Sequence, residues 1–126
     1  MRTVLITGAN RGLGLETAKQ LLEKGFFVYL GMRDTSKAEK LVNELSSISK
    51  EFKLLELDIL KNSQIRDALS EIRNAGHSLD ILINNAGRGD EALIDDIDEA
   101  HWNMVLALNL KGAFFTIQAC LPALKE

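Results

Sequence analysis

The sequence alternates between short apolar segments and longer segments with helical periodicity, and this alternation restricts the fold more than any other feature. The apolar segments span residues 3–7, 26–30, 54–58 and 79–83. Between them, apolar residues recur at the spacing of one helix face, and Gly25 and Gly76 follow two of these stretches as helix ends. Strict alternation requires right-handed crossovers and a parallel sheet covered on both faces. We therefore predict an α/β fold with a doubly wound parallel sheet and four strand–helix units.

Polar residues next to these segments predict where helices begin. The expected caps of the second helix are Asp34, Thr35 or Ser36, those of the third Asn62 or Ser63, and those of the fourth Asp96 or Asp98. The fourth helix should run from Asp98 to about Lys125, with Pro122 bending or ending it. Since a doubly wound sheet normally continues into further strands, we expect either a fragment, truncated before the later strands, or an exposed fourth strand.

Composition excludes several classes of protein. The chain has 126 residues, 46% of them hydrophobic, and a net charge of -3. This charge gives no general attraction to nucleic acid or to an anionic membrane. A single cysteine, Cys120, excludes a disulfide framework and a thiolate zinc site, and no metal site is expected. No segment has the roughly 20 consecutive apolar residues of a membrane span, and the first apolar run is too short for a signal peptide, so we expect a cytoplasmic protein.

The segment that joins the first strand to the first helix carries three glycines, in the pattern Thr7-Gly8-Ala9-Asn10-Arg11-Gly12-Leu13-Gly14. Glycines allow the sharp turn and the close approach of bare backbone to a phosphate, and the free N–H groups of a helix start favour a pyrophosphate. The Gly-Lys-Ser/Thr of a phosphate-binding kinase loop does not follow. A structural turn is the simpler interpretation, but the position at the first strand–helix crossover favours nucleotide binding.

Four motifs together resemble those of the short-chain dehydrogenases/reductases, in particular the amino-terminal portion of carbonyl-reductase-like members. They are the Thr7–Gly14 loop, Asp58 after the third strand, Asn84-Asn85-Ala86-Gly87 after the fourth strand, and Asn109-Leu110-Lys111-Gly112 in the fourth helix. The motifs occur in the family's order and spacing. The resemblance implies that residues 1–126 form an NAD(P)-binding domain of the Rossmann type.

The resemblance also implies roles for individual residues. It assigns the pyrophosphate to the loop residues Gly8, Asn10, Arg11, Gly12, Leu13 and Gly14, with Asn10 and Arg11 reaching toward the adenosine. It assigns the adenine to Asp58 and Ile59, and the path to the nicotinamide ribose to Asn85, Ala86 and Gly87. Asn109 would be the first member of the family's Asn-Ser-Tyr-Lys catalytic tetrad. The structural alternative for Asn84 and Asn109 is a buried amide that ties loops to the sheet.

The residue at the end of the second strand indicates which dinucleotide is preferred. NAD-preferring enzymes place an acidic residue there, and NADP-preferring enzymes place a cation against the 2′-phosphate. In the register set by Gly25, Met32 occupies the acidic position and Arg33 follows. We therefore predict NADP(H), held by Arg33 with help from Arg11. A two-residue shift of register would instead place Asp34 there and favour NAD.

The tetrad is incomplete in this chain. Family spacing places the serine and the Tyr-x-x-x-Lys further beyond Asn109 than Glu126 reaches. The single tyrosine, Tyr29, lies within the second strand and is rejected as a catalytic residue. Two interpretations follow: the cofactor-binding part of an oxidoreductase acting on a small-molecule carbonyl or alcohol, or a catalytically inactive, truncated dinucleotide-binding module that acts through oligomerisation. A methyltransferase is a third, disfavoured by Met32 and by the Asn-Asn-Ala-Gly run.

Other polar and aromatic residues receive structural interpretations. The acidic residues of segment 88–99 should be solvated rather than bind a cation, and His77 and His101 should be surface or cap residues. Cys120 should be a small apolar core side chain, and Trp102 should anchor the start of the fourth helix. That helix is apolar on more than one side. In relatives it packs into a dimer interface, so we expect a homo-oligomer.

Overall fold

A computed structural model describes residues 1–87 and 94–125, and strands and helices alternate along it as predicted. The first elements are β1 (Thr3–Ile6), α1 (Gly12–Glu23), β2 (Phe27–Met32), α2 (Glu39–Ser46), β3 (Phe52–Glu56), α3 (Asn62–Asn74) and β4 (Ile81–Ile83). A short 3-10 turn, η1 (Ile94–Asp96), precedes a long helical stretch. That stretch consists of α4 (Glu99–Leu106), the π-helical turn η2 (Ala107–Gly112) and α5 (Ala113–Leu124).

The four strands form one parallel sheet in the order β3-β2-β1-β4. β1 pairs on both sides, so that Leu5 lies opposite Tyr29 of β2 and Leu82 of β4. The chain thus proceeds outward from β1 to β3 and then returns to the other side of β1. This reversal confirms the doubly wound topology. It also creates a switch point between β1 and β4, where sheets of this kind form a crevice at the carboxyl ends of their strands.

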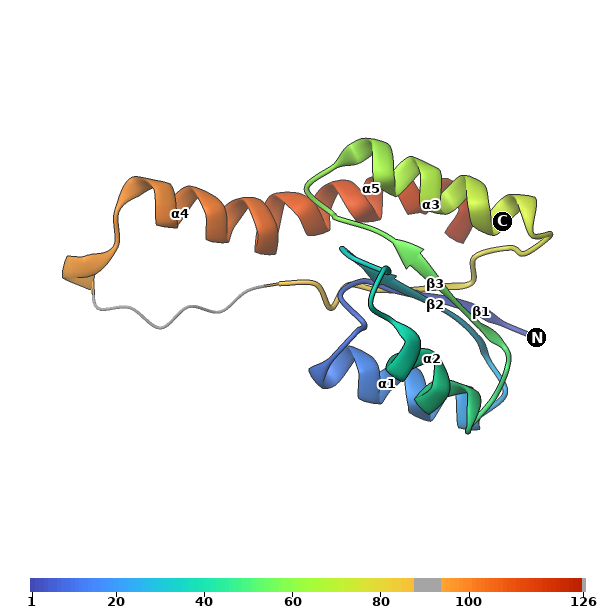
Figure 1. Cartoon of the computed structure of the whole chain (residues 1–126). Helices are drawn as coiled ribbons and strands as arrows, with labels where there is room; N and C mark the ends of the chain where they lie inside the picture. Colours follow the sequence, from blue (N-terminus) through green and yellow to red (C-terminus); the bar gives the residue numbers. More distant parts are fainter. Residues whose placement is uncertain (88–93, 126) are drawn as a thin grey trace.

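Helices cover both faces of the sheet, α1 and α2 on one side and α3 and α5 on the other (Figure 1). Successive strand residues point to opposite faces. Val4, Ile6 and Leu30 therefore pack with α1 and α2, whereas Leu5 and Tyr29 pack with α3 and α5. Burial on both faces explains why the central strands β1 and β2 are almost entirely apolar, whereas the edge strand β3 carries the exposed residues Lys53 and Glu56. Cys120 is fully buried in the second of these cores, as predicted.

Two of the predicted helix caps are wrong. α2 begins only at Glu39, with Ala38 at the N-cap, and α3 is preceded by Lys61, whose side chain makes no capping bond. The Asp34 carboxylate instead accepts hydrogen bonds from the backbone N–H of Ser36 at 2.8 Å and from its hydroxyl at 2.6 Å. Asp34 therefore closes a local turn, and such a turn competes with helix initiation.

The other end of the chain follows the prediction more closely. Asp98 is the N-cap of α4, and its carboxylate accepts a hydrogen bond from the backbone N–H of His101 at 2.7 Å. Pro122 lies inside α5, which continues to Leu124, so proline does not end the helix. Trp102 does not anchor α4, because 59% of its surface is exposed.

The long helix extends beyond the sheet at its α4 end, while α5 lies against the sheet beside α3 (Figure 1). In the described part of the chain, the stretch Glu99–Leu124 is long and apolar enough to cross a membrane by length and composition, with a mean hydropathy of 1.5 and 17% of its apolar window buried. Core helices of soluble proteins meet the same criterion. Glu99–Leu124 is an apolar helix of which little is buried.

Candidate functional site

A cleft of about 690 Å³ opens at the carboxyl edge of the sheet. Each of the four strands contributes the residues that follow it, and the long helix contributes two more. The lining consists of Gly8, Asn10, Arg11, Gly12, Met32, Arg33, Leu57, Asp58, Ile59, Leu60, Asn85, Ala86, Gly87, Met104 and Leu108. All the predicted cofactor-binding residues are in this set except Leu13 and Gly14. The fold thus brings together loops that are distant in the sequence.

The glycine loop forms a bare-backbone wall of the cleft. Gly8 and Gly12 adopt left-handed conformations, with φ of +63° and +60°, which L side chains rarely adopt. A Cβ atom on Gly14 would lie 2.5 Å from Asn85 Nδ2 and 2.7 Å from the Gly8 carbonyl oxygen. Gly14 therefore contributes by allowing close packing behind the loop rather than by lining the cleft. The Leu13 side chain is 81% exposed.

Hydrogen bonds join this loop to the segment after β4. The Thr7 hydroxyl oxygen accepts from the backbone N–H of Asn85 at 3.1 Å and from that of Ala86 at 3.0 Å. The Asn85 side-chain amide donates to the Gly8 carbonyl at 2.9 Å. Thr7 is 1% exposed, and its buried hydroxyl thus provides the acceptor for two backbone N–H groups of a part-buried segment. The buried structural amide considered above for Asn84 and Asn109 is not observed, because both residues are exposed. The half-buried Asn85 instead ties the two loops together.

At the end of β2, the structure places Met32 and Arg33 in the cleft lining and leaves Asp34 outside it. Asp34 is engaged with Ser36, and the hydrogen bonds from the Ser36 hydroxyl and backbone hold the pKa of the Asp34 carboxyl below its ordinary value. β2 ends at Met32, so the two-residue shift of register that would bring Asp34 into the site does not occur.

The turn after β3 supplies the wall farthest along the sheet. The Asp58 backbone N–H donates to Gln64 Oε1 at 2.7 Å, and the Asp58 carboxylate accepts from the Leu60 N–H at 3.0 Å. Ile59, between them, is only 4% exposed and belongs to the core on the α3 and α5 side. A hydrogen-bonded turn with a buried side chain at its centre gives this part of the cleft a defined shape.

Asn109 lies in the π-helical turn η2, which interrupts the regular helix between α4 and α5. Its side-chain oxygen is 2.9 Å from the position that a Cβ atom on Gly87 would occupy, so the segment after β4 passes directly over it. Single π turns inside α-helices are frequent at functional sites. Asn109 is thus next to the cleft but is not among the residues that line it.

Two lining residues, Met104 and Leu108, were not identified from the sequence. They lie four positions apart and so share one face of the helical stretch. One feature of the sequence could have indicated Leu108: it directly precedes Asn109, the first residue of the motif in the fourth helix. Their approach to the cleft depends on how the helix crosses the sheet, which periodicity does not specify.

The remaining candidates lie away from the cleft. Tyr29 is completely buried and absent from the lining, in agreement with its rejection as a catalytic residue. His77 is not simply a surface residue: it is half-buried, and its ring lies 4.4 Å from that of Phe27. Among residues 1–87 and 94–125, no group of three or more histidine, cysteine, aspartate or glutamate side chains could hold a metal ion. Asp90 and Glu91 lie outside the described residues.

A parallel sheet with a glycine-lined crevice at its switch point defines a dinucleotide-binding class of α/β protein. The chain belongs to the short-chain dehydrogenase family, which it matches over residues 2–126. It is 35% identical over 124 residues to the 3-oxoacyl-[acyl-carrier-protein] reductase of Staphylococcus epidermidis, an alignment that covers 96% of this chain and 50% of that protein. The chain therefore spans about half the length of the curated relatives it matches.

Solved structures agree with this assignment. The structure of ElxO with NADP bound superposes with a TM-score of 0.87 at 25% identity, covering 96% of this chain and 49% of that one. An NADH-dependent reductase, A1-R′, complexed with NAD superposes with a TM-score of 0.86 at 27% identity, covering 98% of this chain and 52% of that one. Similar chains thus bind either dinucleotide, and the preference of this chain depends on its own residues.

Proposed function

We propose that this chain is the NADP(H)-binding part of an oxidoreductase that transfers a hydride between nicotinamide and a small-molecule carbonyl or alcohol. The observation that carries the proposal is the cleft at the switch point, where bare glycine backbone and two arginines face the same space. Cβ atoms at Gly8 or Gly14 would collide with protein atoms at 2.9 Å or less, so the loop packs closely against the segment after β4. The Ala9 N–H is bonded to the Gly31 carbonyl at 3.0 Å, and we assign the pyrophosphate to the N–H groups at the start of α1.

In this proposal, each wall of the cleft binds a different part of the cofactor. The Gly8–Gly14 loop binds the pyrophosphate, with Asn10 and Arg11 on its adenosine side, and Asp58 and Ile59 hold the adenine. Asn85, Ala86 and Gly87 guide the nicotinamide ribose. When bound, the nicotinamide supplies or accepts the hydride. Thr7 and Asn85 keep the two central loops at a fixed separation, and this orients the binding groups before the ligand arrives.

The preference for NADP(H) over NAD(H) rests on Arg33. Arg33 lines the cleft, and its guanidinium would offer a planar pair of donors to a 2′-phosphate, whereas the neutral Met32 precedes it. Arg11 approaches the same space from the glycine loop. The nearest acidic residue in the sequence, Asp34, is outside the cleft and occupied by Ser36, so it is not in place to accept hydrogen bonds from a ribose 2′-hydroxyl.

In this proposal, hydride and proton transfer also require the serine and the Tyr-x-x-x-Lys of the tetrad, which this chain does not supply. Asn109 is proposed as the first member of a catalytic tetrad, next to the cleft and close to Gly87. The serine and the Tyr-x-x-x-Lys would be contributed by the part of the relatives that this chain does not span. We therefore expect the 126-residue chain to bind cofactor without reducing a carbonyl.

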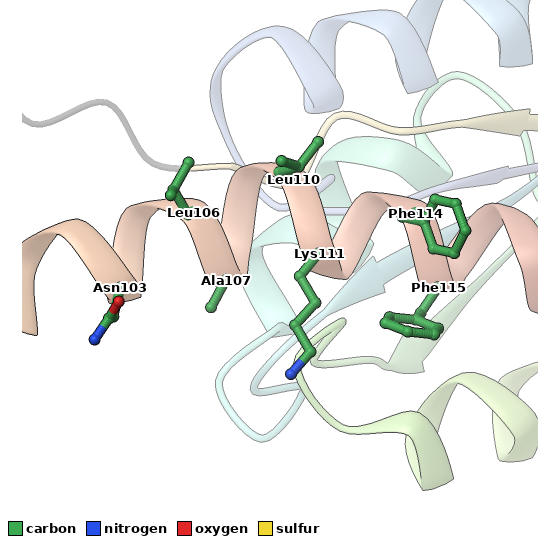
Figure 2. Close-up of a pocket in the computed structure, with 7 residues that line it drawn as sticks. All are labelled: Asn103, Leu106, Ala107, Leu110, Lys111, Phe114 and Phe115. Carbon is green, nitrogen blue, oxygen red and sulfur yellow. The ribbon is translucent and has the colours of Figure 1, made fainter.

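A second function, as a catalytically inactive truncated module that acts through self-association, is favoured by the surface of the long helix. A groove of about 660 Å³ on α4, η2 and α5 is lined by Asn103, Leu106, Ala107, Leu110, Lys111, Phe114 and Phe115 (Figure 2). Leu110 and Phe114 are 65% and 58% exposed, and exposed apolar surface of this kind marks association sites. We propose a cytoplasmic homo-oligomer, with no membrane or nucleic-acid partner.

Calorimetric titration of the 126-residue chain with NADPH and with NADH tests the main proposal. We expect saturable binding of both and tighter binding of NADPH. A carbonyl-reduction assay on the same preparation should show no turnover. Absence of heat with either dinucleotide would exclude the cofactor-binding function, and turnover by the chain alone would show that its catalytic groups are complete.

A further inference from the structure

The backbone conformation at position 112 does not require a glycine. Its φ and ψ angles, -61° and -44°, are those of an ordinary right-handed helix, and it is buried. Inside a helix, glycine is less favourable than alanine because its backbone loses more freedom on folding. A different constraint must therefore account for glycine at this position.

The constraint is the side chain of Ile59, from the turn after β3. A Cβ atom on Gly112 would lie 2.9 Å from Ile59 Cδ1 and 3.0 Å from Ile59 Cγ1. It would also lie 3.3 Å from the carbonyl oxygen of Ala107, a tighter distance than usual but a milder one. Gly112 thus provides the space into which Ile59 fits.

Ile59 is the anchor of the turn that forms one wall of the cleft. Its side chain is 4% exposed, whereas the next residue, Leu60, is 50% exposed. The backbone on either side is held by the bonds from Asp58 N–H to Gln64 and from Leu60 N–H to the Asp58 carboxylate. Because Ile59 is buried and its turn is held by these bonds, its side chain has little space in which to rotate without moving the cleft wall formed by Asp58 and Ile59.

We propose that Gly112 is a positioning residue for the adenosine side of the cleft and that it acts through Ile59. The inference rests on the proposed function, since it assigns the Asp58–Ile59 wall to adenosine. A side chain at position 112 would push Ile59 and its turn into the cleft. Binding of the adenosine half of the cofactor would then weaken, although residue 112 touches no ligand and is not itself among the lining residues.

The test uses Gly112→Ala in the 126-residue chain, with two ligands titrated separately. Adenosine 2′,5′-bisphosphate represents the adenosine half, and reduced nicotinamide mononucleotide represents the other half. We expect Gly112→Ala to lower affinity for the bisphosphate about tenfold, in line with the usual cost of overpacking, and to leave the affinity for the mononucleotide unchanged. The second variant, Gly112→Ala with Ile59→Val, removes Cδ1 and should recover most of the lost affinity.

The outcomes separate this inference from the proposed function. If the wild-type chain binds neither ligand, the proposed function fails. If the wild-type chain binds the bisphosphate and Gly112→Ala binds it equally well, the positioning role of Gly112 is wrong. If Gly112→Ala weakens binding but Ile59→Val brings no recovery, the effect does not act through Ile59, and the contact with the Ala107 carbonyl is responsible instead. If Gly112→Ala does not fold, Ile59→Ala carries the test: loss of the anchor should weaken bisphosphate binding selectively, and unchanged binding would overturn the inference.

Discussion

The phenol oxygen of Tyr29 lies 2.7 Å from Nδ1 of His77, and this hydrogen bond joins the middle of β2 to the turn that follows α3. The two residues are 48 positions apart. Their rings are 5.7 Å apart in an edge-on arrangement, and the Phe27 ring contacts both. Lys53 and Glu71, paired at 2.7 Å, are the charged groups that act on the phenol. The hydrogen bond between Tyr29 and His77 therefore holds the sheet against the layer that contains α3.

Burial raises the pKa of the Tyr29 phenol above its ordinary value of 10.0. A raised pKa in the folded state means that the folded chain holds this proton more tightly than the unfolded chain. The associated stability is present below pH 10 and is lost as the pH rises further. We predict a decline in the urea midpoint above pH 10. Tyr29 is the single tyrosine, so phenolate absorbance follows it directly.

Tyr29→Phe provides the comparison for this prediction. It should lower the free energy of unfolding at neutral pH by about 1 kcal/mol, the net value of one hydrogen bond, and should remove the alkaline decline due to the phenol. Affinity for NADPH should not change, because Tyr29 is outside the cleft. A variant whose stability declines at high pH as steeply as that of the wild type would contradict this account.

The Thr7 hydroxyl offers a second test of stability. Thr7→Val keeps the shape of the side chain but leaves the N–H groups of Asn85 and Ala86 without their acceptor. We expect a loss of about 2 kcal/mol in urea unfolding, the cost of unsatisfied buried donors. Thr7→Ser retains the hydroxyl and should lose much less. Equal losses in the two variants would show that packing of the methyl group matters, and not the hydrogen bonds.

Gly14→Ala tests the close contact behind the glycine loop. The new Cβ atom would meet Asn85 Nδ2 and the Gly8 carbonyl, so the bond between them should break and stability should fall by about 2 kcal/mol. NADPH affinity should fall with it. Gly12→Ala is the matched control, since nothing lies within 4 Å of its Cβ position and only the left-handed backbone is strained, at a cost of about 1 kcal/mol. Chemical denaturation that ranks the two variants in the opposite order would exclude the steric explanation.

Arg33→Asp tests the cofactor preference. Loss of a charge-assisted pair of hydrogen bonds, with an anion in its place, should weaken NADPH binding by at least about tenfold and should affect NADH much less. Arg66→Asp, on α3 and outside the cleft lining, makes the same change of net charge and should leave both affinities as they are. Equal loss for the two dinucleotides, measured by calorimetry, would remove Arg33 from the 2′-phosphate site.

Self-association is tested on the groove of the long helix. We expect the wild-type chain to sediment as a dimer or larger species, and Phe114→Glu to shift it toward monomer, because a charge in a buried apolar interface is costly. Val42→Glu, on α2 and 36% exposed, is the control and should not change the sedimentation coefficient. A wild-type chain that sediments as a monomer at all accessible concentrations would contradict the proposed assembly.

Several features of the site could be predicted from the sequence because they depend on local properties of the chain. The glycines of the first loop predicted a sharp turn, and two of them adopt left-handed backbone conformations there. The position of Gly25 set the register of β2, and Met32 and Arg33 accordingly lie at the cleft. The same local reasoning did not predict the cap of α2, because Asp34 had a second, equally local partner in Ser36.

The amino-acid sequence by itself therefore determined the alternation of strands and helices, the bare loop and the cationic residue at the end of β2. Each of these follows from periodicity or backbone conformation within a few residues. Only the tertiary structure decided that His77 meets Tyr29, that Leu108 and Met104 reach the cleft, and that Gly112 makes room for Ile59. Those contacts join segments that come together only when the sheet closes and the helices pack, as Asn85 and Gly8 do across 77 positions. Hydrophobic patterning directs a side chain to the core but does not select its neighbour there.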